Sequence, residues 1–304
     1  MGLGGLSGMD ARATRAGAVP VAVRPQAARW KMARVACIAT VACLLAACTT
    51  PGLRIDTSHT SVVQASRVQF LILHYTVADF DLSLDILARQ GRVSSHYLVR
   101  EDPVEVYRLV DESRLARHAG VSEWRGVTSL NASSIGIEIV NPGFTDTPGG
   151  RVYAPYPEAQ IDVVVELVRQ IMARHDIRPE FVLGHADIAP GRKQDPGPMF
   201  PWKRLADEGL VPWPDAAQVA ARLAHHAVQP LPDVAWFQQQ LARVGYRVPR
   251  HGELDEATRD VISTFQMKYR PGDIRGEPDA ETAALLDVVV TPGGMRVART
   301  AAAH

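Results

Sequence analysis

Residues 68–75 read VQFLILHY, a nearly continuous apolar run that ends in a polar tip. Such a run is typical of a β-strand that is buried on both faces of a sheet. A second run, residues 134–140 (SIGIEIV), alternates three isoleucines with Gly136 and Glu138. Because side chains alternate across a strand, this period of two places Glu138 on the face opposite the isoleucines.

A helix is predicted between the second of these strands and a third strand farther along the chain. Apolar residues fall at helical spacing between Pro157 and His175, and Pro179 follows. Proline suits the first turn of a helix and the stretch beyond its end. Residues 181–184 (FVLG) then read as a short strand that delivers His185 at its end. Strands alternating with helices predict an α/β domain over residues 65–212, with a mixed central β-sheet flanked by helices.

Length and charge limit the possible functions. The 304 residues, 46% of them hydrophobic, suffice for about two domains. The chain carries 33 basic and 33 acidic residues, and the first 47 positions hold six basic and one acidic, which leaves 27 − 32 = −5 for the remainder. A mildly acidic protein has no broad basic field for phosphate backbones, so we expect no nucleic acid partner.

Residues 1–47 are interpreted as a leader and lipoprotein signal peptide. Lys31 and Arg34 precede an apolar run over residues 35–47, and Met32 would give it a short basic start. This run is shorter than the roughly 20 residues that a spanning helix needs. Residues 45–48 (LAAC) resemble a bacterial lipobox, which implies cleavage before Cys48 and lipidation of that residue. An ordinary secretory cysteine is the alternative.

All three cysteines lie in one N-terminal stretch, at positions 37 and 43 of the leader and at position 48 directly after it. The rest of the chain can therefore form no disulfide and offer no thiolate ligand. Any metal site there must use histidine or carboxylate side chains.

One such set stands at the predicted strand ends. His74 and His185 each terminate an apolar strand, and Asp195 follows in the Pro/Gly-rich segment 184–198 (GHADIAPGRKQDPGP). Neighbouring strands of an open sheet bring such residues to one edge, where these sheets place their sites. A hydrolytic zinc site needs three protein ligands and one open position. Taken singly, each histidine could equally cap a strand or belong to the core, and spacing alone leaves both possibilities open.

Five segments occur in the order and character of a known enzyme family: residues 71–76 (LILHYT), 94–99 (SSHYLV), 117–120 (RHAG), 134–141 (SIGIEIVN) and 184–202 (GHADIAPGRKQDPGPMFPW). Over residues 65–212 the chain resembles the type 2 N-acetylmuramoyl-L-alanine amidases. Within that family it is most similar to the lipid-anchored outer-membrane enzymes of Gram-negative bacteria. These enzymes cut the amide bond between N-acetylmuramic acid and L-alanine in peptidoglycan.

The resemblance implies roles for individual residues. It makes His74, His185 and Asp195 the ligands of one Zn²⁺ per chain, Glu138 the general base for the attacking water, and Lys193 the cation that steadies the oxyanion. A solvated strand residue and an ordinary loop charge are the alternatives for Glu138 and Lys193.

Three further residues in the matching segments are possible substrate contacts rather than ligands. They are His96, His118 and Asn131.

Other classes fit less well. Peptidoglycan-recognition proteins that only bind have typically lost a ligand, whereas all are present here, and relatives that use cysteine as third ligand differ from a chain with Asp195. A general zinc peptidase is disfavoured because no HExxH string occurs. A non-catalytic peptidoglycan receptor or anchor remains the main alternative.

Residues 233–290 resemble a three-helix peptidoglycan-binding domain. Two segments, GELD at 252–255 and GEPD at 276–279, each continue into Asp-x-x-Thr, a pattern that suits helix N-caps. Because this segment holds no predicted site residue, we expect its deletion to spare cleavage of small soluble muropeptides. Residues 48–64 are interpreted as a tether, 213–232 as a linker helix with His225 and His226 solvated, and 291–304 as a flexible tail.

These features together predict the setting of the protein. We expect a lipid-anchored outer-membrane enzyme that faces the periplasm, because Thr49 rather than aspartate follows Cys48 and, by analogy with the family that the chain resembles, this favours outer-membrane sorting. Its partners would be peptidoglycan or muropeptides, and the membrane through the anchor. No obligate protein partner is implied.

Overall fold

The computed structural model describes residues 53 and 55–298. The chain divides into two units, Met1–Val62 and Val63–His304. In the first unit, the described residues are exposed and form neither helix nor strand. No helix in the described part of the chain is long and apolar enough to cross a membrane.

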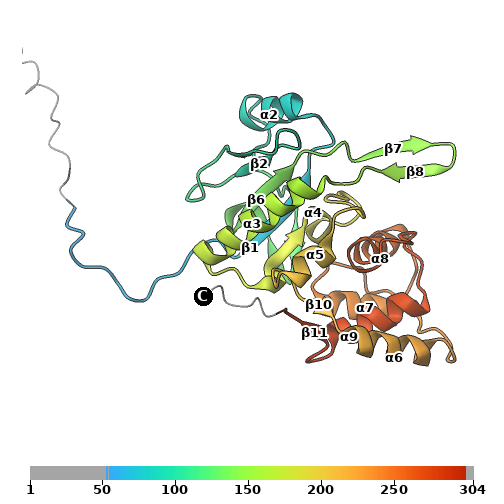
Figure 1. Cartoon of the computed structure of the whole chain (residues 1–304). Coiled ribbons are helices and arrows are strands. Elements are labelled where there is room, and N and C mark those ends of the chain that lie inside the picture. The colour runs from blue at the N-terminus through green and yellow to red at the C-terminus, as the bar shows by residue number, and fades with distance from the viewer. Residues whose placement is uncertain (1–52, 54, 299–304) are drawn as a thin grey trace, which may run out of the picture. The chain divides into compact units, whose positions relative to one another are not determined.

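A five-stranded sheet forms the centre of the second unit (Figure 1). Its order is β3 (Val106–Arg108), β2 (Tyr97–Val99), β6 (Ser134–Ile139), β1 (Phe70–Tyr75) and β9 (Val182–Gly184). All neighbours are parallel except β2 and β3. This confirms the predicted mixed sheet. The runs 68–75 and 181–184, which were predicted to be strands, contain β1 and β9.

One face of the sheet packs on helix α3 (Glu158–His175). Leu71 and Leu73 of β1 lie on this face, in register with Ile135 and Ile137 of β6. These side chains and those of α3 form one buried core. The predicted helix and the predicted orientation of the isoleucines are both confirmed.

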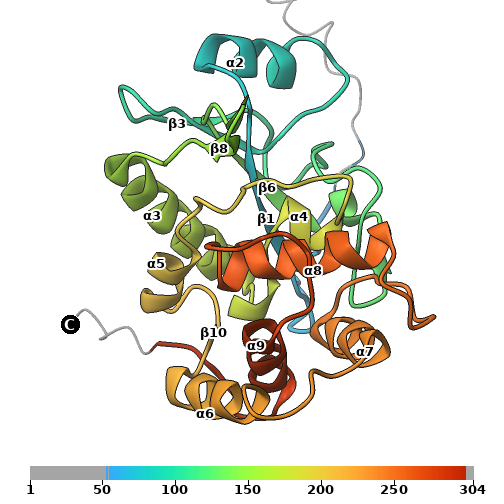
Figure 2. The same ribbon diagram turned by 90° about the vertical axis from the view of Figure 1, so that its right-hand side faces the viewer.

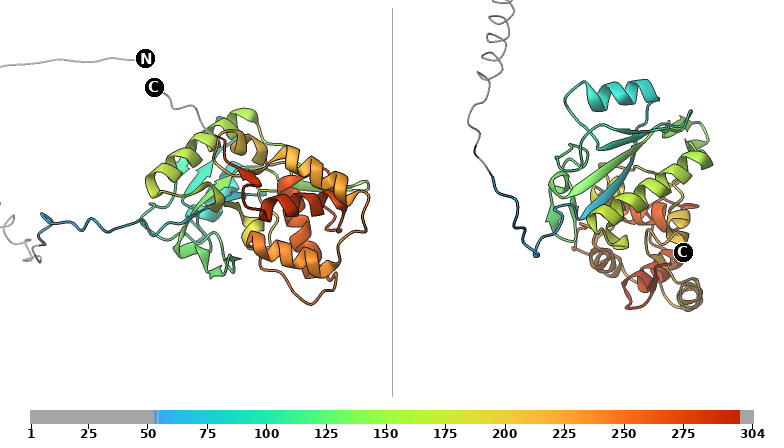
Figure 3. Two further views of the ribbon diagram at one scale, coloured as in Figure 1. Left: turned by 90° about the horizontal axis from the view of Figure 1, so that it is seen from below. Right: turned by 60° about the vertical axis from the view of Figure 1, so that its left-hand side comes forward.

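The opposite face packs on the C-terminal helices. Phe70 and Ile72 of β1 and Leu183 of β9 share a buried core with α7 (Val234–Val244), α8 (Glu256–Tyr269) and α9 (Ala280–Val290). Figure 2 views the molecule from this side, with α8 crossing in front of β1 and α4 (His185–Ile188). The left panel of Figure 3 shows the C-terminal helices grouped beside the sheet.

The predicted helix caps are confirmed in this three-helix unit. The carboxylates of Asp255 and Asp279 accept the backbone amides of Thr258 and Thr282 at 2.8 and 2.7 Å. Gly276 precedes the second cap with φ +74°, and a Cβ there would lie 2.4 Å from a backbone oxygen. Glycine is therefore required at this turn.

The linker and the tail are more ordered than predicted. Linker helix α6 (Ala216–His226) is held to α9 by a bond of 2.8 Å between His226 and Asp287, so the interpretation of a solvated His226 is wrong. β10 (Trp213–Pro214) pairs with β11 (Met295–Arg296). The prediction that the tail is flexible from residue 291 onward is therefore wrong for residues 291–296.

Several elements were not predicted from the sequence. They are α2 (Phe80–Ala88), β2, β3, β4 (Glu123–Trp124), β5 (Val127–Thr128), η1 (Leu130–Ala132), β7 (Phe144–Thr147), β8 (Gly150–Tyr153), η2 (Pro179–Phe181), α4, α5 (Trp202–Asp207), β10 and β11. Strands β7 and β8 form a hairpin that projects from the body of the molecule (Figure 1).

The shared core argues against the expectation that residues 233–290 can be removed without harm. Deletion would expose Phe70, Ile72 and Leu183, which are at most 2% exposed in the intact chain. Exposing buried apolar side chains costs about 1.5–3 kcal/mol each. Residues 233–290, called the C-terminal unit below, are thus part of the scaffold of the amidase-like domain at residues 65–212.

This core predicts cooperative unfolding of the two domains. Phe265→Ala removes a fully buried ring of α8 and should lower the free energy of unfolding by about 3–5 kcal/mol. Amide hydrogen exchange should quicken in β1 as well as in α8. Val228→Ala, at a side chain that is 77% exposed, is the control. Loss of protection in α8 alone would show that the domains unfold independently.

Candidate metal centre and active site

The three predicted ligands converge on one point. His74 lies near the end of β1, His185 opens α4 directly after β9, and Asp195 follows in the next loop. The two histidine Nδ1 atoms are 2.9 Å apart, and Asp195 Oδ2 lies 2.9 and 3.0 Å from them. All three side chains are buried. In the described part of the chain they form the only group of three such side chains that could hold a metal ion.

The loop between His185 and Asp195 closes on itself. The backbone amide of Ala186 donates to the Asp195 carbonyl at 2.8 Å. Gly184 permits the contact, because a Cβ there would lie 2.8 Å from Cδ of Pro196. This closure brings residues ten positions apart to the same point.

The hydrogen bond of His185 fixes its tautomer. Its Nε2 lies 3.1 Å from the carbonyl oxygen of Ala119. The Arg192 guanidinium lies farther from Nε2, at 3.4 Å, and donates to the same carbonyl at 2.7 Å. Since a carbonyl only accepts, Nε2 carries the hydrogen. The Nδ1 atom that faces Asp195 is then a bare lone pair.

A chain of hydrogen bonds fixes the tautomer of His74 in the same way. The Ser134 hydroxyl donates to the Leu130 carbonyl at 2.7 Å, so it accepts from His118 Nε2 at 3.1 Å. His118 Nδ1 is therefore an acceptor, and His74 Nε2 donates to it at 3.0 Å. Nδ1 of His74 is left bare.

The donor set fits zinc. Two bare nitrogens and a carboxylate oxygen lie about 3 Å apart with no hydrogen between them, an arrangement that repels itself unless a cation is present. Burial and His185 lower the pKa of His74 to about 4, so its ring is neutral at pH 7. Two imidazoles and one carboxylate are the ligands of many catalytic zinc sites.

Glu138 lies beside this centre because of strand register. It pairs with His74 across β1 and β6, and both side chains point to the face opposite the isoleucines. Glu138 is partly buried. Burial raises the pKa of its carboxyl group well above the ordinary value, and Asp195 raises it further, while Lys193 opposes both. A carboxylate with a raised pKa is a better proton acceptor.

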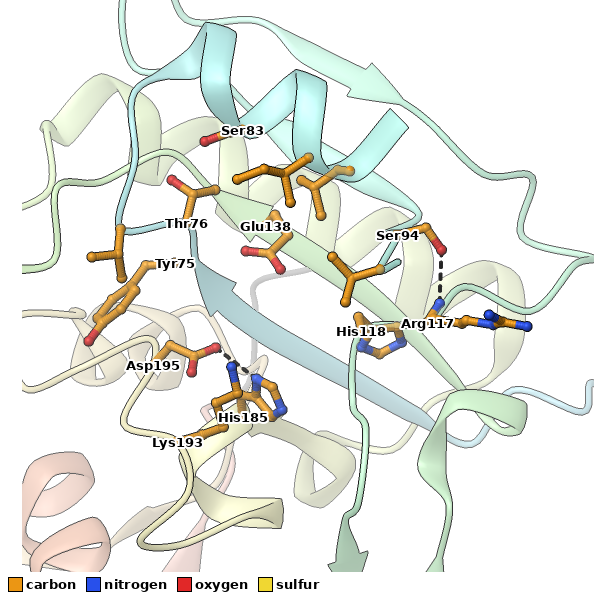
Figure 4. A pocket seen from close by; sticks show the side chains of 14 residues that line it. Tyr75, Thr76, Ser83, Ser94, Arg117, His118, Glu138, His185, Lys193 and Asp195 are labelled. Atoms are coloured by element: carbon orange, nitrogen blue, oxygen red, sulfur yellow. Dashed lines mark hydrogen bonds and ion pairs between the residues drawn. The ribbon is translucent and has the colours of Figure 1, made fainter. Parts of the chain in front are cut away.

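A cavity of about 260 Å³ opens over Glu138, His185 and Asp195 (Figure 4). Lys193, an exposed residue, lies at its edge. The sequence reasoning missed the other wall, which mixes apolar and polar side chains and to which α2 contributes Ser83, Ile86 and Leu87. Its residues are Tyr75, Thr76, Val77, Ser83, Ile86, Leu87, Val93, Ser94 and Arg117. Only the presence of Tyr75, Thr76, Ser94 and Arg117 in the quoted motifs could have signalled them.

The three predicted substrate contacts have different outcomes. His96 is fully buried, accepts from the Gly136 amide at 3.0 Å and donates to the Arg114 carbonyl at 3.1 Å, so a substrate contact is wrong. His118 lines the cavity, but both of its ring nitrogens are engaged. The side-chain oxygen of Asn131 accepts the amides of His118 and Ala119. Asn131 thus orders the loop that holds both ligand histidines.

Residues 64–198 match a family model described as N-acetylmuramoyl-L-alanine amidase, and residues 230–286 match a putative peptidoglycan binding domain. The N-acetylmuramoyl-L-alanine amidase AmiD of Escherichia coli (strain K12) is 43% identical over 249 residues, which are 80% of this chain and 90% of AmiD.

Solved structures agree with this. A complex of AmiD with anhydro-N-acetylmuramic acid-L-Ala-D-gamma-Glu-L-Lys has a TM-score of 0.72, and the alignment covers 79% of this chain and 95% of AmiD. AmpDh3 from Pseudomonas aeruginosa, in complex with anhydromuramic pentapeptide, is 37% identical with a TM-score of 0.71 over 77% of this chain and 96% of that one. The chain therefore belongs to the N-acetylmuramoyl-L-alanine amidase family.

Proposed function

We propose that the protein is a zinc-dependent amidase that hydrolyses the bond between N-acetylmuramic acid and L-alanine of peptidoglycan. The observation that carries this proposal is the convergence of three hydrogen-free ligand atoms beside Glu138 at the floor of an open cavity. The muropeptide ligands named for AmiD and AmpDh3 support the choice of substrate.

In this proposal His74, His185 and Asp195 hold one Zn²⁺. Bound zinc supplies a Lewis acid that polarises the amide carbonyl and lowers the pKa of water. Each of the two histidine ligands keeps its orientation through a second hydrogen bond. For the histidines these bonds run to His118 and to the Ala119 carbonyl.

Glu138 and Lys193 supply the proton transfer and the positive charge. Glu138 takes a proton from the attacking water and returns it to the amine of L-alanine as the carbon–nitrogen bond breaks. The ammonium group of Lys193, at the edge of the same cavity, stabilises the oxyanion of the tetrahedral intermediate. Both roles need the side chains to face the cavity, as Figure 4 shows.

A receptor that binds peptidoglycan without cutting it is the alternative. Such a protein needs neither a complete ligand set nor a carboxylate with a raised pKa beside it, whereas this chain has both. The complete set therefore favours hydrolysis.

Glu138→Gln separates catalysis from metal binding. The amide keeps the size of the side chain but cannot take the proton, so the turnover of a defined muropeptide should fall about 10²- to 10⁴-fold. Zinc content, measured by atomic absorption on the same sample, should stay at one per chain, as in the wild type. Near-wild-type turnover in Glu138→Gln would show that Glu138 has only a structural role. A wild-type protein that binds peptidoglycan without releasing stem peptide would favour the receptor.

His118→Phe tests the hydrogen bonds that orient His74. The change preserves a buried ring but removes the acceptor for His74 Nε2, so the affinity for zinc should fall about 10- to 100-fold in a chelator competition. His225→Phe, at an exposed histidine of α6, is the control. Equal zinc affinity in both variants would contradict the assigned tautomer chain.

The protein is further proposed to be an outer-membrane lipoprotein facing the periplasm, with its C-terminal unit on peptidoglycan. Cys48 and the lipobox-like residues 45–48 support this, although they lie outside the described residues. Cys48→Ala should release the protein from the membrane fraction of cells, with Cys43→Ala as the control. Wild-type protein that fractionates as soluble material without a lipid mass would refute the anchor.

A further inference from the structure

Asp187 connects the turn of the metal centre to the C-terminal unit. It lies in α4, two residues after His185, and is 3% exposed. Its Oδ1 accepts from the Tyr246 hydroxyl at 2.7 Å, and its Oδ2 accepts from the Lys268 ammonium at 2.8 Å. Tyr246 follows α7 and Lys268 lies in α8, so both donors come from the predicted peptidoglycan-binding unit.

These two donors are buried with their acceptor. The Lys268 side chain is 9% exposed, and its ammonium lies 4.2 Å from the ring centre of Trp202 in α5. Tyr246 is 4% exposed and meets the ring of Trp124 edge-on at 5.0 Å. Removing one partner of a buried ion pair leaves an uncompensated buried charge, which is strongly destabilising. Asp187 is therefore held by the C-terminal unit.

The same carboxylate also holds the backbone of the metal centre. Oδ2 of Asp187 accepts from the amide of Gly184, the last residue of β9, at 2.8 Å. The next turn of the loop is fixed by the bond from the Ala186 amide to the Asp195 carbonyl at 2.8 Å. Asp187 thus lies within the turn that carries two of the three ligands.

We propose that Lys268 and Tyr246 are positioning residues for the metal centre, which they act on through Asp187 and the turn from Gly184 to His185. The C-terminal unit then has a second role besides wall binding, as part of the scaffold that fixes His185. This inference rests on the proposed zinc amidase function.

Lys268→Met in the full chain tests the inference. It keeps the length of the side chain but leaves Asp187 without its cation. We expect the zinc dissociation constant to rise about tenfold or more, as for other residues that support ligands. On a small soluble muropeptide, kcat should fall while KM changes little, because the cavity wall of α2 is untouched.

Arg270→Met is the matched control. The Arg270 side chain is also 9% exposed and pairs with Asp279 inside the same unit, away from α4. It should lower stability but keep wild-type zinc affinity, measured at a temperature where circular dichroism shows both variants folded. Equal zinc affinity and kcat in Lys268→Met and Arg270→Met would overturn the proposal.

Tyr246→Phe is a second variant that tests the proposal if Lys268→Met fails to fold. It removes one hydrogen bond to Asp187 and keeps the ring, so it should weaken zinc binding without unfolding the chain. Wild-type zinc affinity and kcat in this variant would overturn the proposal. Wild-type protein that neither binds zinc nor releases stem peptide would instead refute the proposed function, so the two failures are distinguishable.

Discussion

Three acceptor atoms that face one another without a hydrogen are the constraint on which the site depends. The Nδ1 atoms of His74 and His185 and Oδ2 of Asp195 lie within 3.0 Å of each other inside the protein. Such an arrangement costs free energy unless a cation neutralises it and the surrounding groups keep each ring in place. Much of the nearby structure keeps the two histidine rings in place.

The parallel register of the sheet provides the first part of that support. His74 and Glu138 are neighbours in register, and β9 ends on the other side of β1, where His185 begins α4. On one face Leu71, Leu73 and the three isoleucines pack against α3, while His74 and Glu138 stand on the other face. The amidase chemistry and the packing of the sheet are thus separated by the alternation of side chains along a strand.

The face of the sheet opposite α3 is divided between the metal site and the contact with the C-terminal unit. Farther back along β1, Phe70 and Ile72 pack on the C-terminal helices, while His74 stands at the cavity end. The two domains therefore share one core. This geometry lets Lys268 and Tyr246 reach Asp187, and it gives a domain of the peptidoglycan-binding type a structural task as well.

The sequence alone determined the three strands β1, β6 and β9, helix α3, the helix caps and the candidate ligands. These follow from local period, from caps a few residues long and from polar residues at strand ends, which are readable along the chain. Tertiary structure decided the rest. The contact of His74 with His118 joins positions 44 apart, and that of Asp187 with Lys268 joins positions 81 apart. Such contacts depend on which surfaces pack together, so His96, His226 and the C-terminal unit took roles that no local pattern could indicate.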